Sequence, residues 1–131
     1  MATELKMLAL AGLLTLGLSL LTIVAYFFRF GGAALRDNRE GDGPLPGLVG
    51  RTVRTHHNLI EALVPFAAVV VAAQLAGISN PVTVEASAIF LAARIAHAAL
   101  YLAGVRVLRS AAFYVGVGST IAIAIQLPLA P

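Results

Sequence analysis

Four long apolar stretches dominate the hydropathy pattern of the chain, and short polar segments separate them. The first stretch extends from Met7 to Phe28 without a charged residue, and the last extends from Ser110 to Leu129. A helix needs about 20 mostly apolar residues to cross a bilayer, and each stretch is long enough. We therefore predict an all-α integral membrane protein, a four-transmembrane-helix bundle that forms a single domain over residues 1–131. Its spans are expected at about 5–28, 54–78, 81–105 and 109–129.

The segments between the spans have the composition of turns and loops. Residues 30–50 are rich in glycine, proline and charge, so we expect a connection over 29–53, although the polar residues just before Ala62 can extend the second helix beyond the apolar core. Asn80 and Pro81 mark a tight turn, with the proline suited to the first turn of the next helix. A cleaved signal peptide is the alternative for the first span. Its apolar run is too long for that, and no A-x-A-like cleavage site follows Phe28.

The composition narrows the possible classes of protein. Of the 131 residues, 60% are hydrophobic and 11% are charged, whereas a soluble domain carries about 25% charged residues to cover its surface. The absence of cysteine excludes a disulfide-stapled module and a cysteine-ligated metal centre. The nine basic residues are too few for a nucleic-acid-binding surface and lie at the ends of apolar segments. They are expected to set the orientation in the membrane and to form a site, with no nucleic-acid partner.

The basic residues are distributed unevenly between the connections. The middle connection, between Ile78 and Val82, contains no lysine or arginine. The first and third connections and their helix ends contain all of the following: Arg29, Arg36, Arg39, Arg51, Arg54, Arg106 and Arg109. Since cytoplasmic loops are enriched in lysine and arginine, the first and third connections are predicted to be cytoplasmic. The absence of a long polar tail or a retrieval signal is compatible with a bacterial inner membrane.

A polar stripe lies at the start of the second span. Its members are spaced i, i+3, i+7 and i+10, which places them on one helix face: Arg51, Arg54, Asn58 and Glu61. His57 flanks this stripe. One interpretation is an interfacial helix end whose arginines reach lipid phosphates, and the other is a ligand site. Glu61 favours the site, because a carboxylate inside an apolar run needs a cationic partner. Pro65 cannot donate to the Glu61 carbonyl, so a kink and a free acceptor are expected there.

A second set of polar residues lies on the third and fourth spans. Arg94, His97 and Tyr101 share one helix face at i, i+3 and i+7. An arginine within a membrane span indicates either a functional site or a buried ion pair, here with Glu61 or Glu85. Arg109 and Ser110 open the fourth span, where the helix dipole disfavours a cation, so Arg109 has either an anionic partner or a purely topological role. No metal site is predicted, because the adjacent histidines point to different faces and no H-E-x-x-H spacing occurs.

These polar groups converge on the cytoplasmic end of the bundle. Several guanidinium groups with one carboxylate complement a small zwitterionic molecule that has more than one carboxylate and one ammonium group. Glutathione fits, and so do other acidic peptides and anionic lipid head groups. The frequent alanines and glycines of the spans permit close helix packing, within one subunit or in a homo-oligomer.

Two sequence segments resemble the MAPEG family, the membrane-associated proteins in eicosanoid and glutathione metabolism. The first is R-T-V-R-T-H-H-N-L-I-E-A-L-V-P-F from Arg51 to Phe66, and the second is A-R-I-A-H-A-A-L-Y-L-A-G-V-R-V-L-R-S from Ala93 to Ser110. Together with the four spans, the resemblance covers nearly the whole chain and is that of a bacterial-type member. It implies a homotrimer of four-helix subunits, with glutathione bound between subunits near the cytoplasmic face.

The resemblance also assigns roles to individual residues. Arg109 and Ser110 match the arginine-serine pair that the family places at the thiol of glutathione. The other positions that the resemblance and the polar pattern assign to glutathione binding are Arg29, Arg51, Arg54, His57, Asn58, Glu61, Arg94, His97 and Tyr101. The chain departs from the family at Ala62 and Phe113, where some members have an aromatic residue and a tyrosine, so two hydroxyl contacts are missing.

The implied activity is that of a microsomal-type glutathione transferase or peroxidase. The Arg109 guanidinium would lower the thiol pKa, and the thiolate would attack a lipophilic electrophile or hydroperoxide that arrives through the membrane lipids. Glutathione would then be a co-substrate, and no protein cysteine is required. The alternative is a non-catalytic scaffold or lipid-binding protein of the same fold, since a fold does not by itself establish catalysis.

Overall fold

The computed structural model describes residues 1–37 and 45–127. The described part of the chain forms four long helices and one short 3-10 turn. Their bounds are α1 Thr3–Phe30, η1 Ala33–Leu35, α2 Gly47–Leu75, α3 Pro81–Ala103 and α4 Val107–Ala124. All four α-helices are long and apolar enough to cross a membrane, which confirms the predicted all-α membrane fold. Arg39, one of the predicted orientation signals, and the end of the predicted fourth span lie outside the described residues.

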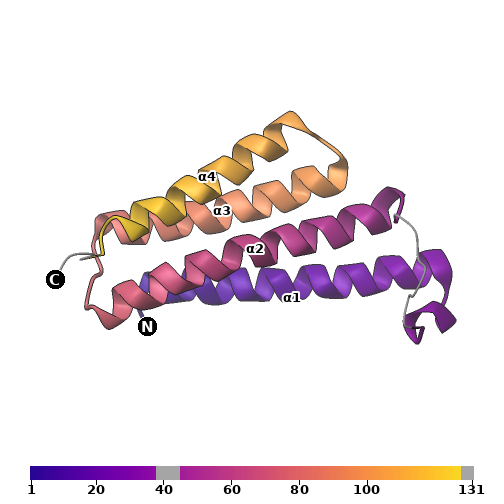
Figure 1. Cartoon of the computed structure of the whole chain (residues 1–131), viewed down its shortest axis with the longest axis horizontal. Helices are drawn as coiled ribbons and strands as arrows, with labels where there is room; N and C mark the ends of the chain where they lie inside the picture. Colours follow the sequence, from indigo (N-terminus) through magenta and orange to yellow (C-terminus); the bar gives the residue numbers. More distant parts are fainter. Residues whose placement is uncertain (38–44, 128–131) are drawn as a thin grey trace.

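Consecutive helices run in opposite directions (Figure 1). The N-terminus, the turn between α2 and α3 and the end of α4 lie at one end of the bundle, and the turn between α3 and α4 lies at the other. The most extensive contacts are those of α3 with α4 and of α1 with α2. We refer to the end with the α3–α4 turn as the basic end, because Arg29, Arg51 and Arg106 lie there, and to the opposite end as the terminal end.

The second helix begins at Gly47, inside the segment that the sequence assigned to a connection over 29–53. The polar residues after Pro46 can be helical because side-chain hydroxyls among them hydrogen-bond to the carbonyls of the helix backbone. Thr52 and Thr55 are fully buried, and their hydroxyls donate to the carbonyls of Val49 and Arg51 at 2.8 and 2.7 Å. The polar stripe is therefore part of one continuous α2, which also passes through Pro65 without interruption.

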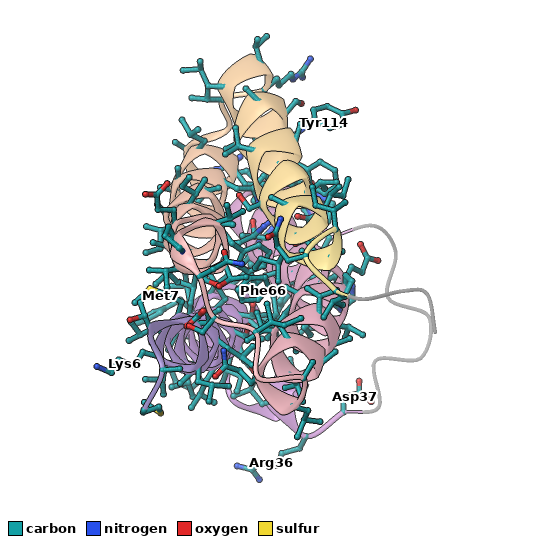
Figure 2. The ribbon with its side chains drawn as sticks, turned by 90° about the vertical axis from the view of Figure 1, so that its left-hand side faces the viewer. Lys6, Met7, Arg36, Asp37, Phe66 and Tyr114 are labelled. Atoms are coloured by element: carbon teal, nitrogen blue, oxygen red, sulfur yellow. The ribbon has the colours of Figure 1, made fainter. Side chains whose placement is uncertain are left out.

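The centre of the bundle is closely packed between α2 and α3. The rings of Phe66 and Phe90 are both fully buried and stack with their centroids 3.7 Å apart. Phe66 lies inside the bundle, whereas Lys6 and Arg36 point away from it (Figure 2). The buried residues around the stack are mostly small, and they bring the helix backbones close enough for dispersion contacts that lipid does not match. They are Ala11, Val70, Ala73, Ala86 and Ile123.

A buried carboxylate joins α1 to α3 at the terminal end. Glu4 is 2% exposed, and its Oε1 accepts hydrogen bonds from the Ser79 hydroxyl at 2.8 Å and the Thr83 hydroxyl at 2.6 Å. Thr83 is in the first turn of α3, where the free backbone N–H groups favour negative charge. No pattern in the sequence indicates this role of Glu4, because its partners are far away in the chain.

The start of α3 has a complete capping box. Asn80 Oδ1 accepts from the Thr83 backbone N–H at 3.1 Å, and the Thr83 hydroxyl accepts from the Asn80 backbone N–H at 3.0 Å. Asn80 also donates through Nδ2 to Gln126 Oε1 at 3.1 Å, which links α3 to the residues after α4. The predicted turn with Pro81 at the first helical position has this geometry.

We expect Asn80→Ala to lower the free energy of unfolding by about 1–2 kcal/mol, because both the cap and the Gln126 bond are lost. Asn80→Asp is the matched control, since its carboxylate can still accept from Thr83 but cannot donate to Gln126. The two variants should therefore differ in denaturant unfolding in detergent, with Asp the more stable. Equal destabilisation by both would show that the cap contributes nothing measurable.

Candidate functional site

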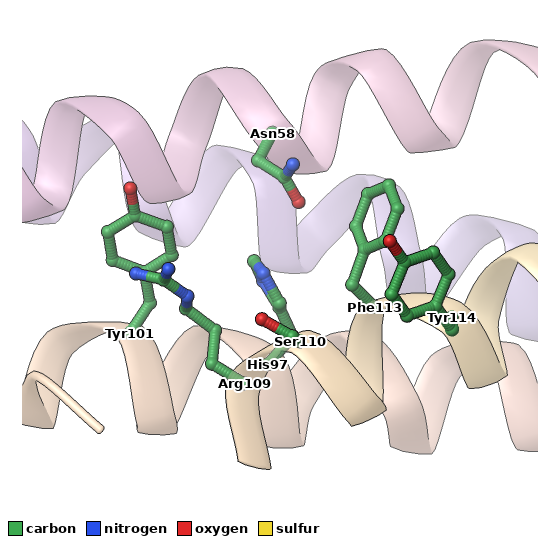
Figure 3. Close-up of a pocket in the computed structure, with 7 residues that line it drawn as sticks. All are labelled: Asn58, His97, Tyr101, Arg109, Ser110, Phe113 and Tyr114. Atoms are coloured by element: carbon green, nitrogen blue, oxygen red, sulfur yellow. The ribbon is translucent and has the colours of Figure 1, made fainter. Parts of the chain in front are cut away.

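A polar pocket of about 310 Å³ opens near the basic end of the bundle, between α2, α3 and α4 (Figure 3). Asn58 approaches it from α2, and the other lining side chains come from the end of α3 and the start of α4. The lining residues are Asn58, His97, Tyr101, Arg109, Ser110, Phe113 and Tyr114. Five of these seven were predicted site residues, so the structure brings together groups from three separate helices.

Arg109 and Ser110 lie in the first turn of α4, at the entrance to this polar pocket. The Arg109 guanidinium carbon is 4.2 Å from the centre of the Tyr101 ring, a cation–π contact that holds the side chain across the ring. Within the described residues this guanidinium makes no hydrogen bond, so its N–H groups remain available. The exposed Ser110 hydroxyl donates to the Arg106 carbonyl at 3.2 Å. The pocket thus presents a fixed cation with unused donors.

His97 forms the buried wall of the polar pocket. It is 5% exposed, and its ring lies 5.6 Å from the Tyr101 ring and 6.2 Å from the Phe113 ring. These aromatic neighbours restrict the imidazole to one orientation, with Tyr101 half-buried beside it. The wall therefore combines an apolar surface with an imidazole and a phenol that can hydrogen-bond a ligand.

A second cavity of about 270 Å³ adjoins the polar pocket and shares Tyr101 and Arg109 with it. We call it the arginine cavity, after four of its lining residues: Arg51, Arg54, Arg106 and Arg109. Arg51 is held by a 2.9 Å hydrogen bond from its Nε to the Leu102 carbonyl at the end of α3. No acidic side chain lines either cavity. The pair of cavities therefore forms a continuous electropositive region, suited to a ligand with several anionic groups.

Arg94 is fully buried but does not line the polar pocket. Its Nη2 donates to the Phe113 carbonyl at 3.0 Å and its Nη1 to Asn58 Oδ1 at 3.4 Å. The ion pair considered from the sequence, with Glu61 or Glu85, does not form within the described residues. Both carboxylates are exposed on their helices, whereas the guanidinium is enclosed between α2, α3 and α4. Arg94 therefore contacts two residues that line the pocket, the side chain of Asn58 and the backbone carbonyl of Phe113, without lining the pocket itself.

Besides Arg94, three predicted site residues line neither the polar pocket nor the arginine cavity. Glu61 and His57 are exposed on α2, and the described residues supply no cationic partner for Glu61. Arg29, at the end of α1, borders a separate and mainly apolar cavity of about 350 Å³ that includes Phe28 and Leu48. Helical spacing placed Glu61 in the same stripe as Asn58, but the face of α2 that packs on α3 and α4 continues through Ala62 and Phe66, and Glu61 is exposed outside it. A single chain therefore assembles the arginines and aromatic groups of the site without its carboxylate.

Tyr114 is a lining residue that the sequence analysis did not select. It follows Ser110 by four residues, so the two side chains lie on one face of α4, and that periodicity was the available signal. Its ring contacts that of Phe113 at a centroid distance of 5.4 Å. Figure 3 shows the two rings side by side, with the Tyr114 hydroxyl at the pocket. Tyr114 thus supplies a hydroxyl next to the position where Phe113 lacks one.

The described residues contain no group of three histidine, cysteine or acidic side chains close enough to hold a metal ion. The side chains that line the polar pocket offer a cation and hydrogen-bond donors. A guanidinium at 4.2 Å from a phenol ring, with a serine next to it, can stabilise an anion that forms during a reaction.

Comparison with known proteins shows to which family this chain belongs. The sequence pattern of the MAPEG family matches residues 7–128, which is almost the entire chain and includes all four membrane helices. No curated protein matches the sequence significantly. The four-helix membrane fold agrees with this match. The chain therefore belongs to the MAPEG family, whose members are membrane proteins associated with glutathione and eicosanoid metabolism.

Proposed function

We propose that this protein is a glutathione-dependent transferase or peroxidase that acts on lipophilic electrophiles or hydroperoxides in the membrane. The observation that carries the proposal is the Arg109 guanidinium, which lies over Tyr101 at the entrance of the polar pocket with its donors unused. Glutathione is small, net anionic and contains one thiol. The adjoining cavities offer separate regions for its carboxylates and for its sulfur.

The arginine cavity suits the carboxylates of glutathione. Guanidinium groups bind carboxylates through two parallel hydrogen bonds, and Arg51, Arg54 and Arg106 line this cavity. The thiol would then lie in the polar pocket, near Arg109 and Ser110. Since both cavities share Arg109 and Tyr101, one extended ligand can occupy them together.

The chemistry follows from the charge next to the sulfur. A free thiol has a pKa of about 8.5, and a neighbouring guanidinium lowers that pKa because it favours the thiolate. The thiolate attacks an electrophilic carbon to form a thioether, and either a leaving group departs with its bonding electron pair or an activated double bond accepts the pair and is then protonated. With a hydroperoxide the thiolate attacks an oxygen, the O–O bond breaks, and the alcohol and a sulfenic form of glutathione result. A second glutathione reduces the sulfenic form, which gives the disulfide and water.

Assembly as a homotrimer is a further part of the proposal. Glu61, His57 and Arg29 are exposed in a single chain, on faces that a neighbouring subunit could cover. A subunit interface would give Glu61 an ammonium partner from glutathione and would remove a carboxylate from contact with lipid. In this assembly the glutathione site is completed by two chains.

Binding of glutathione to the detergent-purified protein tests the proposal. We expect saturable binding below millimolar concentration, together with the ultraviolet absorbance of a thiolate. S-Methylglutathione is the matched control, because it keeps both carboxylates and the ammonium but cannot ionise at sulfur. It should compete for binding without the thiolate signal. Absence of glutathione binding at millimolar concentration would reject the proposal, and binding without thiolate or turnover would favour the non-catalytic alternative.

We also propose that the basic end faces the cytoplasm, in a bacterial inner membrane. The chain has no cysteine, so single cysteines can be introduced into an unreactive background. Val82→Cys, in the exposed first turn of α3, should react with a membrane-impermeant maleimide in intact cells. Arg36→Cys, exposed at the opposite end, should react only after lysis. The reverse labelling pattern would invert the proposed topology.

A further inference from the structure

The buried Arg94 separates the polar pocket from an apolar cavity deeper in the bundle. This cavity has a volume of about 220 Å³, and it is lined by Arg94 itself, Phe90, Gly116, Thr120 and apolar side chains of α2 and α4. The guanidinium carbon lies 5.3 Å from the Phe90 ring centre and 5.1 Å from that of Phe113. A positive charge in this position is energetically unfavourable, because its desolvation is costly and no carboxylate neutralises it within the described residues.

Gly116 provides the space for this guanidinium. A Cβ atom at position 116 would lie 2.7 Å from Arg94 Nε and 2.9 Å from Cζ, and closer still to Nη2. Such distances are too short for contact, so a side chain at position 116 would displace Arg94 from its place. Gly118, one half-turn along the same helix, has no atom within 4 Å of an added Cβ. The requirement for glycine is therefore specific to position 116.

The contact of Arg94 with Asn58 determines what the pocket offers to a ligand. An amide can present either its oxygen or its NH₂ group, and the two orientations have similar shapes. Asn58 Oδ1 accepts from Arg94 Nη1 at 3.4 Å, and no described residue accepts from Nδ2, so the NH₂ group is left to donate to a ligand in the polar pocket that Asn58 lines. Without Arg94 the amide would be free to rotate and to present its oxygen, which repels an anionic ligand.

From this geometry we infer that Arg94, seated against Gly116, is a positioning residue that fixes the Asn58 amide as a hydrogen-bond donor to the polar pocket. Arg94 does not line the polar pocket, and we attribute its effect on binding to the Asn58 side chain, because its hydrogen bond to Phe113 is to the backbone carbonyl. The inference rests on the proposed function only in taking glutathione as the ligand. Gly116 of α4 thereby influences ligand binding without contacting the ligand, because it leaves the space that the Arg94 guanidinium occupies.

A double-mutant cycle with glutathione binding tests this coupling. Gly116→Ala should raise the Kd of wild type for glutathione roughly tenfold, and Gly118→Ala should leave it within about twofold. In an Asn58→Ala background, Gly116→Ala should have no further effect on Kd, because the group it acts through is already absent. Arg94→Met, which keeps the volume and removes the donors, should reproduce Gly116→Ala. Additive effects of Gly116→Ala and Asn58→Ala would overturn the inference.

A second measurement needs no ligand. It tests whether Arg94 holds the Asn58 amide even if glutathione does not bind. The side-chain NH₂ resonances of Asn58 in ¹⁵N-labelled protein can be assigned by their loss in Asn58→Ala. They should shift in both Gly116→Ala and Arg94→Met but not in Gly118→Ala. Unchanged resonances in the first two variants would show that Arg94 does not hold the amide, and would overturn the inference. Failure of wild type to bind glutathione would reject the proposed function and leave this test intact.

Discussion

Replacing Arg109 by alanine should abolish the thiolate absorbance of bound glutathione and lower kcat roughly 100-fold, the scale seen when one preorganised donor to a developing anion is removed. The reason is that Arg109 is the cation shared by both cavities and is held over Tyr101 with its N–H groups unused. Glutathione binding should weaken less than kcat falls, because the arginine cavity retains three other guanidinium groups.

One further variant separates the charge of Arg109 from its shape, and a second is a control at a distant arginine. Arg109→Lys keeps the positive charge but loses the planar fork, so its activity should lie between those of wild type and the alanine variant. Arg36→Ala removes an exposed arginine far from the pocket and should leave the activity unchanged. Stopped-flow absorbance measures the thiolate of bound glutathione, and steady-state kinetics measure kcat. A thiolate signal of wild-type size in Arg109→Ala would exclude the role proposed for this residue.

Glu4→Ala should be the most destabilising of the substitutions considered for stability, lowering the free energy of unfolding by about 2–4 kcal/mol. Glu4 is the acceptor for two hydroxyl donors, Thr83 of α3 and Ser79 of the preceding turn, and the loss of its carboxylate removes that acceptor from the fully buried Thr83 as well as from the exposed Ser79. The contact is the polar connection between α1 and α3 at the terminal end. Its loss should therefore weaken the packing of the first helix.

The conservative variant Glu4→Gln separates the effect of losing the hydrogen-bond acceptor from the effect of losing the negative charge. Glu4→Gln keeps an oxygen at the position of Oε1, so the Ser79 and Thr83 bonds can form and the stability should be close to that of wild type. Glu85→Ala, an exposed acid on α3, should change the free energy of unfolding by less than about 0.5 kcal/mol. Unfolding in mixed detergent micelles, followed by circular dichroism, compares the three. If Glu4→Ala were as stable as Glu85→Ala, the buried carboxylate would have no structural role.

The sequence predicted the four helices because a bilayer imposes a simple requirement on length and polarity. Every backbone group in the hydrocarbon region must be satisfied within a helix, so an apolar stretch of sufficient length indicates its own structure. The beginning of α2 was less predictable. Its first turns are polar, and they become helical because Thr52 and Thr55 are buried and bond to the helix backbone.

Helical periodicity was similarly effective for the part of the site that lies on single helices. The spacing of His97 and Tyr101 on α3 and the adjacency of Arg109 and Ser110 on α4 located most of the polar pocket. Periodicity assigns a face to each residue, but it does not say which neighbouring helix covers that face. For this reason Glu61 and Asn58 appeared equivalent in the sequence, although only Asn58 lies under α3 and α4 in the described structure.

By itself, then, the sequence determined the membrane fold, the four helices and the basic character of one end, because these depend on local length, polarity and charge. The tertiary structure alone decided which polar groups meet. The partners of Arg94, the space at Gly116, the hydroxyl of Tyr114 and the buried bonds of Glu4 all depend on the packing between helices. Contacts of this kind join residues far apart in the chain, and the pattern within one helix contains no information about its neighbours.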